Sequence, residues 1–171
     1  MRLLPLGTLI CGLVLAGCRR EPAPLVQVEV GDLARLEGEV QKLRGKAVLL
    51  NFWAIWCAPC VAELPDLDKT LRAFADRGGT VLAVSYDLML PKAEREATVQ
   101  KVREFLQTKG YAFPAFVYDA ADYDAINARF DLPGGVPVTL AIDAAGRIVG
   151  RHEGEADLAR FTELMQKALA R

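Results

Sequence analysis

The stretch that decides the fold is Ala47-Val-Leu-Leu-Asn-Phe-Trp-Ala-Ile-Trp-Cys-Ala-Pro-Cys60. Its first half, residues 47–53, is a continuous apolar run broken only by Asn51, which is typical of a central strand buried on both faces. Its second half carries two cysteines and leads into residues 61–74, whose pattern predicts a helix broken or bent at Pro65. The sequence therefore places an isolated CxxC pair between a buried strand and a helix.

A cysteine at the start of a helix differs chemically from one elsewhere. Unpaired N–H groups and the positive end of the helix dipole favour a thiolate there. The pKa of such a thiol can fall from about 8.5 to between about 3.5 and about 7.5. We therefore expect Cys57 to be the nucleophile of a thiol-disulfide exchange. Cys60, one helical turn later, would be the resolving thiol that attacks a mixed disulfide on Cys57. Pro59 would lie in the first turn, where no intrahelical N–H is needed.

Length and composition limit the number of domains and the kinds of partner. At 171 residues and 52% hydrophobic content, the chain is long enough for one compact domain with its own core. Lysine and arginine number 21 against 22 acidic residues, without a basic block or an aromatic-studded basic stripe, so nucleic acid is not an expected partner. The four cysteines divide into Cys11 and Cys18 near the N-terminus and the CxxC pair.

The N-terminus has the outline of an export signal. Arg2 precedes a mostly apolar run that ends in Leu15-Ala-Gly-Cys18 and is short for a membrane span. Small residues before a cysteine resemble the bacterial lipoprotein box, which implies a signal peptide over residues 1–17 and a lipid anchor on Cys18. Residues 18–25 would then be a tether and residues 26–171 the folded domain. An ordinary cleaved signal or an uncleaved anchor is the alternative.

Strand and helix patterns alternate along the rest of the chain. Strands are expected at 26–30, 80–85, 115–118, 137–142 and 147–152, and helices at 33–43, 91–109, 122–130 and 156–170. A strand, a helix and a strand in succession imply a parallel pair. The last two strands, joined by a short turn, indicate a β-hairpin.

Two motifs carry a family resemblance. One runs from Val48 through the CxxC pair to Pro65, and the other runs from Gly135 to Ile148. Together they resemble the TlpA/ResA-type thioredoxin-like proteins of bacterial envelopes, from about residue 25 to the C-terminus. Residues 86–130 match only in outline, as the family's inserted strand-helix element. The resemblance implies an α/β thioredoxin-like fold with a central mixed sheet flanked by helices.

The same resemblance implies residues that bind substrate. Pro137 would be the cis-proline that faces the cysteines, and Val136 before it would offer backbone groups to a bound peptide. Trp56 would be a lid over the disulfide, and with Pro59 it would contact the substrate. The alternative for Pro137 is a trans proline that begins a strand.

A buried acid is expected to carry protons in this site. Asn51 occupies the position where ordinary thioredoxins have a buried aspartate, and an amide cannot carry a proton. Glu63 follows Cys60 by three residues, where the family also has an acid. It would accept and return the proton of the resolving thiol, with a pKa raised by partial burial. The alternative is a solvated glutamate that only complements the helix dipole.

Other classes of function fit the sequence less well. A zinc site needs four ligands, but the chain has no second CxxC and His152, expected on the surface, is its single histidine. A copper-binding assembly protein that holds metal through the two cysteines is the alternative function, with only His152 and Met89 as further candidate ligands. A peroxidase would need a hydroxyl residue at Ala54. No resident cofactor or metal is expected.

The resemblance implies a reductant of exported client cysteines, such as those of apocytochrome c before haem attachment or of a copper site. Its partners would be exported proteins with cysteine thiols or disulfides, a membrane electron donor and, through Cys18, the lipid bilayer. The domain would face the periplasm or another extracytoplasmic space. The residues between the cysteines are compatible with a reducing pair, although they only partly set its potential.

Overall fold

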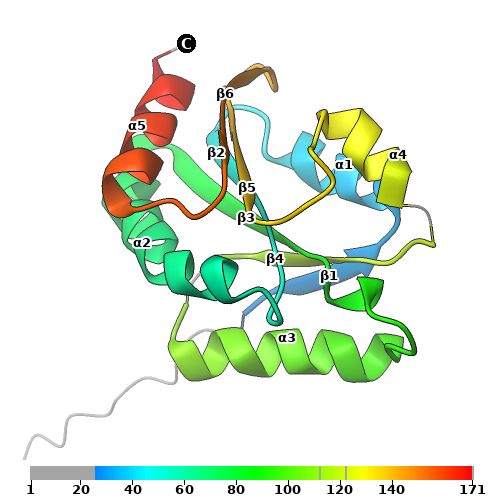
Figure 1. The fold of residues 1–171 in the computed structure, drawn as a ribbon. Helices are drawn as coiled ribbons and strands as arrows, with labels where there is room; N and C mark the ends of the chain where they lie inside the picture. Colours follow the sequence, from blue (N-terminus) through cyan, green and yellow to red (C-terminus); the bar gives the residue numbers. More distant parts are fainter. Residues whose placement is uncertain (1–25, 112, 122, 171) are drawn as a thin grey trace, which may run out of the picture.

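A six-stranded mixed sheet with helices on both faces forms the centre of the computed structural model, which describes residues 26–111, 113–121 and 123–170 (Figure 1). The strands are β1 (Val28–Gly31), β2 (Ala47–Trp53), β3 (Gly79–Ser85), β4 (Ala115–Tyr118), β5 (Val138–Ile142) and β6 (Ile148–Glu153). The helices are α1 (Leu33–Lys42), α2 (Ala58–Phe74), α3 (Arg95–Lys109), α4 (Tyr123–Phe130) and α5 (Leu158–Leu169). The predicted mixed sheet flanked by helices is confirmed.

The order of the strands brings distant parts of the chain together at the end of β2. The order is β1-β4-β3-β2-β5-β6, in which β1, β4, β3 and β2 are parallel, whereas β5 and β6 are antiparallel to their neighbours. All of β2 is buried, as its apolar run predicts. Because β5 runs antiparallel to β2, with Phe52 opposite Val138, the end of β2 lies beside the start of β5. The turn that carries the cysteines therefore lies beside Pro137.

Successive side chains of β2 point to opposite faces of the sheet. Trp53 packs on Phe105 of α3, with ring centroids 5.7 Å apart. Phe52 points the other way and packs on Phe130 of α4 at 5.6 Å. On the Trp53 face, α2 and α5 lie side by side against the sheet (Figure 1). The sheet is therefore covered on both sides, which explains why β2 contains almost no polar residue.

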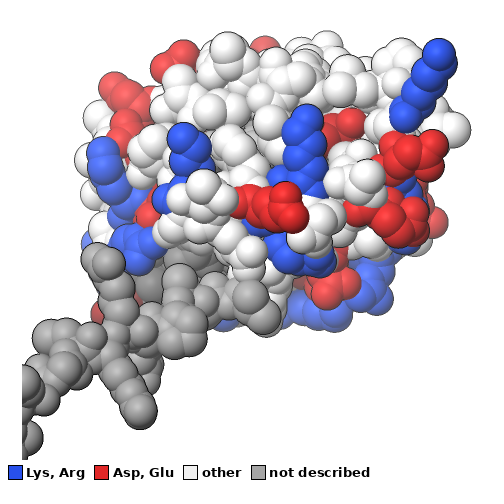
Figure 2. Space-filling model, turned by 90° about the horizontal axis from the view of Figure 1, so that it is seen from below, with Lys and Arg blue, Asp and Glu red and all other residues white. Residues whose placement is uncertain are grey.

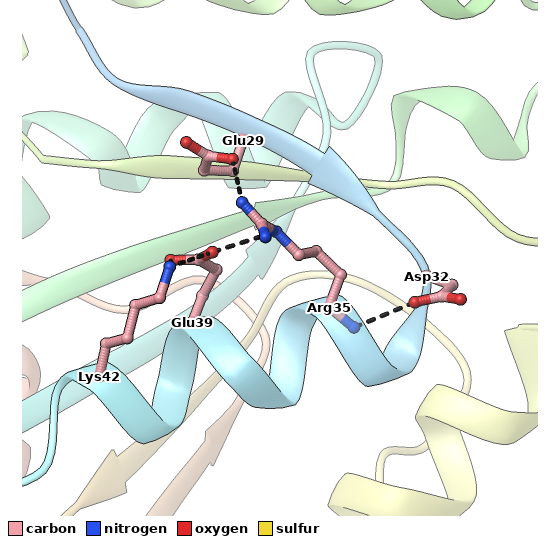
Figure 3. Close-up of polar contacts among 5 residues, drawn as sticks. All are labelled: Glu29, Asp32, Arg35, Glu39 and Lys42. Carbon is pink, nitrogen blue, oxygen red and sulfur yellow. Dashed lines mark hydrogen bonds and ion pairs between the residues drawn. The ribbon is translucent and has the colours of Figure 1, made fainter.

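The first helix is joined to the edge strand by surface ion pairs. Asp32 caps α1 by accepting from the N–H of Arg35 at 3.0 Å. The Arg35 side chain reaches Glu29 of β1 at 2.9 Å and Glu39 at 3.2 Å, and Lys42 pairs with Glu39 (Figure 3). Because Arg35 and Lys42 are more than half exposed, these pairs add little to stability. On the face that α3 covers, positive and negative side chains are likewise interspersed (Figure 2).

Two helices differ most from their predicted extent. The helix predicted over 91–109 begins only at Arg95, because Lys92 has a left-handed backbone with φ of 65°. The helix after the cysteines begins at Ala58 and continues through Pro65 without a break. Pro65 removes one backbone hydrogen bond, but Leu64 and Leu67 beside it are fully buried, and this burial holds the helix together.

Candidate active site

The two cysteines lie at the junction of β2 and α2. Cys57 is the N-cap of α2, and its Sγ accepts a hydrogen bond from the backbone N–H of Cys60 at 3.3 Å. The N–H of Cys57 donates to the carbonyl of Ala54 at 3.2 Å, which closes a tight turn after the strand. The sulfurs form a disulfide, with Cα atoms 5.2 Å apart. Once the pair is reduced, Cys57 Sγ would already lie against the N–H groups that stabilise a thiolate.

The two cysteines differ in accessibility. Cys57 is 6% exposed, whereas Cys60 is fully buried. Trp56 beside them is 45% exposed, and Pro59 is exposed in the first turn of the helix. An incoming sulfur can therefore approach Cys57 but not Cys60. This asymmetry is what an exchange with one attacking and one resolving thiol requires.

The loop before β5 lies against Cys57. The carbonyl oxygen of Val136 is 3.7 Å from Cys57 Sγ, and the Val136–Pro137 peptide bond is cis. Pro137 is buried, while Val136 is half-buried. The backbone of Val136 therefore borders the accessible sulfur.

Glu63 is a buried acid one helical turn beyond Cys60. It is 2% exposed; its Oε1 accepts from Asn51 Nδ2 at 2.8 Å and its Oε2 from the N–H of Ala156 at 2.8 Å. Burial raises the pKa of the Glu63 carboxyl to about 7, the hydrogen bonds from Ala156 and Asn51 lower it, and the charge of Glu155 raises it. A carboxyl with this pKa can exchange a proton near neutral pH.

Asn51 holds this carboxyl from the central strand. Asn51 is fully buried, and its Nδ2 also donates to Thr139 Oγ1 at 2.9 Å, while its Oδ1 has no partner among the described residues. Sequence reasoning does not find Thr139 or Ala156. Thr139 lies opposite Asn51 because of the antiparallel register of β2 and β5, which the sequence does not show. Ala156 takes part through its backbone N–H, which does not depend on its side chain.

His152 and Met89 are the candidates for additional metal ligands. His152 is half-buried on β6, where its Nδ1 accepts from Arg160 Nε at 3.2 Å and its Nε2 lies 3.1 Å from the carbonyl of Glu155. Both ring nitrogens thus have partners within the protein. Met89 is 45% exposed. Across the described ranges, no group of three or more His, Cys, Asp or Glu side chains is arranged to hold a metal ion.

The predicted signal peptide, the anchor Cys18 and the tether over residues 18–25 all lie outside the described residues. Among the helices of the described part, none is long and apolar enough to cross a membrane.

Comparison with known proteins agrees with this geometry. A family model described as the AhpC/TSA family matches residues 20–151. The thioredoxin-like protein YneN of Bacillus subtilis is 35% identical over 126 residues, which cover 72% of this chain and 67% of that protein. The thiol-disulfide oxidoreductase ResA of Halalkalibacterium halodurans is 33% identical over 141 residues, which cover 78% and 72%.

A solved structure has the same fold. It is a thiol:disulfide interchange protein of the thioredoxin family from Chlorobium tepidum, with 28% sequence identity and a TM-score of 0.61 over 75% of this chain and 83% of that one. The predicted thioredoxin-like fold and the resemblance to ResA are therefore confirmed.

Proposed function

The chain belongs to the AhpC/TSA family and is a thiol-disulfide oxidoreductase, and we propose that it reduces disulfides of exported client proteins. The observation that carries this proposal is the asymmetry of the cysteine pair. Cys57 borders the surface at a helix N-terminus, and Cys60 is fully buried one helical turn before Glu63. Such a pair attacks with one thiol and releases its product with the other.

The reaction moves two electrons from the protein to the client. The Cys57 thiolate attacks one sulfur of the client disulfide, forms a mixed disulfide and expels the other client sulfur as a thiolate. Glu63 takes the proton of the Cys60 thiol, and Cys60 then attacks Cys57 Sγ. The second client sulfur leaves as a thiolate, the Cys57–Cys60 disulfide forms, and the proton held by Glu63 passes to solvent or the departing sulfur.

The client peptide is proposed to lie across the mouth of the site. Val136 would offer backbone groups beside Cys57, with Pro137 holding the loop in place. Trp56 and Pro59 border the same sulfur from the helix side and are exposed. These surfaces can bind the main chain and apolar side chains of a client without demanding one particular sequence.

We further propose that the protein is exported and anchored to a membrane. Residues 1–17 would be removed as a signal peptide, Cys18 would carry the lipid, and the domain would stand in the periplasm or another extracytoplasmic space. There a dithiol stays reduced only if a donor resupplies electrons, so a membrane electron donor is required. The clients would be of the cytochrome c maturation or copper-site assembly type. Replacing Cys18 with serine should abolish lipid-dependent membrane binding, measured by partition into detergent and by intact mass.

The reduction potential of the pair tests the direction of electron flow. A fragment that begins after Cys18, equilibrated in glutathione or dithiothreitol buffers, should titrate as one two-electron couple near or below about −200 mV. A value near about −120 mV would make the protein a disulfide donor instead. The Cys60→Ser variant, which cannot close the disulfide, is the matched control. Absence of a reversible couple would overturn the proposed reaction.

A further inference from the structure

Asp87 is a buried carboxylate with no part in the reaction described above. It follows β3 in the short 3-10 helix η2 (Asp87–Met89) and is 5% exposed. The N–H of Ile55 donates to both its oxygens, at 3.2 and 3.1 Å. Ile55 lies in the turn between β2 and α2, two residues before Cys57. The carboxylate therefore binds the turn that delivers the reactive sulfur.

A second contact fixes the carboxylate itself. Ser85 Oγ donates to Asp87 Oδ2 at 2.7 Å and accepts from the N–H of Asp87 at 3.1 Å, which closes a ring of two hydrogen bonds. Ser85 is fully buried and lies opposite Trp53 in the parallel pairing of β2 and β3. Beyond that pair, the N–H of Tyr86 donates to the carbonyl of Trp53 at 2.8 Å. The end of β3 thus holds both the end of β2 and the turn that follows it.

Burial and hydrogen bonds act on the Asp87 carboxyl in opposite directions. Burial raises the pKa of Asp87, while the hydrogen bonds from Ser85 and Ile55 and the charge of Lys101 lower it. Lys101 on α3 and the phenol of Tyr123 on α4 are the titratable groups facing it. Burying an acid costs free energy, which the hydrogen bonds from Ile55 and Ser85 offset.

We propose that Asp87 is a positioning residue for the exchange reaction. Its carboxylate holds the turn so that Cys57 Sγ lies between the N–H of Cys60 and the carbonyl of Val136. The proposal applies to the oxidoreductase activity in either direction of electron flow. A small displacement of a reacting atom is enough to slow a reaction strongly, so this tether is consequential.

Asp143 provides a matched control elsewhere in the fold. It is 1% exposed, and its Oδ1 accepts from the N–H groups of Ala145 and Arg147 at 3.0 and 2.9 Å. Asp143 thus holds the β5–β6 hairpin turn by accepting from backbone N–H groups, as Asp87 holds the turn before Cys57. Each carboxylate accepts from backbone N–H groups of a turn, and Asp143 also pairs with the Arg147 guanidinium at 2.8 Å; of the two, Asp87 contacts the redox turn.

The test compares Cys57 alkylation by iodoacetamide in the reduced full chain, as a function of pH, among Asp87→Ala, Asp87→Asn and Asp143→Ala. Asp87→Ala should slow the reaction at pH 7 on the order of tenfold to a hundredfold. Asn at position 87 can still accept from the N–H of Ile55, so Asp87→Asn should restore the rate to within about threefold of wild type. Asp143→Ala should react as wild type does.

Three results would overturn the proposal. They are an Asp87→Ala rate within about twofold of wild type, an equal slowing by Asp143→Ala, or an Asp87→Asn variant as slow as Asp87→Ala. If Asp87→Ala fails to fold, as judged by near-UV circular dichroism, Ser85→Ala takes its place, because it removes the hydrogen bond that fixes the Asp87 carboxylate. It should then slow the alkylation, and a rate within about twofold of wild type overturns the proposal.

Discussion

The Glu63→Gln substitution tests the buried acid near the disulfide. Burial raises the pKa of Glu63 from 4.5 to about 7, so the folded protein holds a proton that the unfolded chain releases near pH 4.5. The stabilising effect of this proton is fully present below about pH 4.5 and is lost as pH rises through about 7. One pKa unit corresponds to about 1.4 kcal/mol, so the loss amounts to about 3 kcal/mol.

Glutamine keeps the size of the side chain but does not titrate. Its Oε1 can accept from Ala156, and the Asn51 amide can rotate to present its unpartnered Oδ1 to the new amide. We therefore expect the free energy of unfolding of Glu63→Gln, relative to wild type, to rise by about 3 kcal/mol between pH 4.5 and 8. Urea unfolding of the oxidised proteins at half-unit pH steps measures it, with the exposed Glu104→Gln as control.

Parallel pH profiles for wild type and Glu63→Gln would refute the argument, because they would mean that Glu63 titrates normally. The same variant also bears on the reaction. Glutamine cannot take the proton of Cys60, so release of a trapped mixed disulfide should slow by about a hundredfold or more at pH 7. Stopped-flow tryptophan fluorescence can follow that release.

Three further predictions follow from the same site. Replacing Asn51 with alanine removes a hydrogen bond that lowers the pKa of Glu63, so a ¹³C NMR titration should place that pKa above its wild-type value of about 7. Replacing the 45% exposed Trp56 with alanine should change the free energy of unfolding by less than about 0.5 kcal/mol. The same variant should raise KM for a disulfide-containing client peptide. An unchanged KM would mean that Trp56 is not part of the binding surface. Replacing Cys60 with serine should accumulate a mixed disulfide with client on non-reducing gels, whereas Cys57→Ser should accumulate none.

Local patterns in the sequence predicted most of the elements. The apolar run of residues 47–53 predicts β2 with its observed bounds, and the strand at 115–118 was placed with equal accuracy. The helix starts were predicted less well. Lys92 adopts a left-handed conformation that no periodicity reveals, so α3 begins later than predicted, whereas Cys57 does lie at the start of α2 as expected.

The sequence by itself determined the fold class and the reactive pair, because a buried strand leading into CxxC and a helix is a local arrangement that needs no distant partner. Only the tertiary structure decided the surroundings of the pair. Asn51 meets Thr139 across 88 residues of chain, and Glu63 meets the N–H of Ala156 across 93. Such contacts depend on the antiparallel register of β5 and on the packing of α5 against α2. Charge and burial at a site are sums over all neighbours in space, and the order of residues along a chain does not give those neighbours.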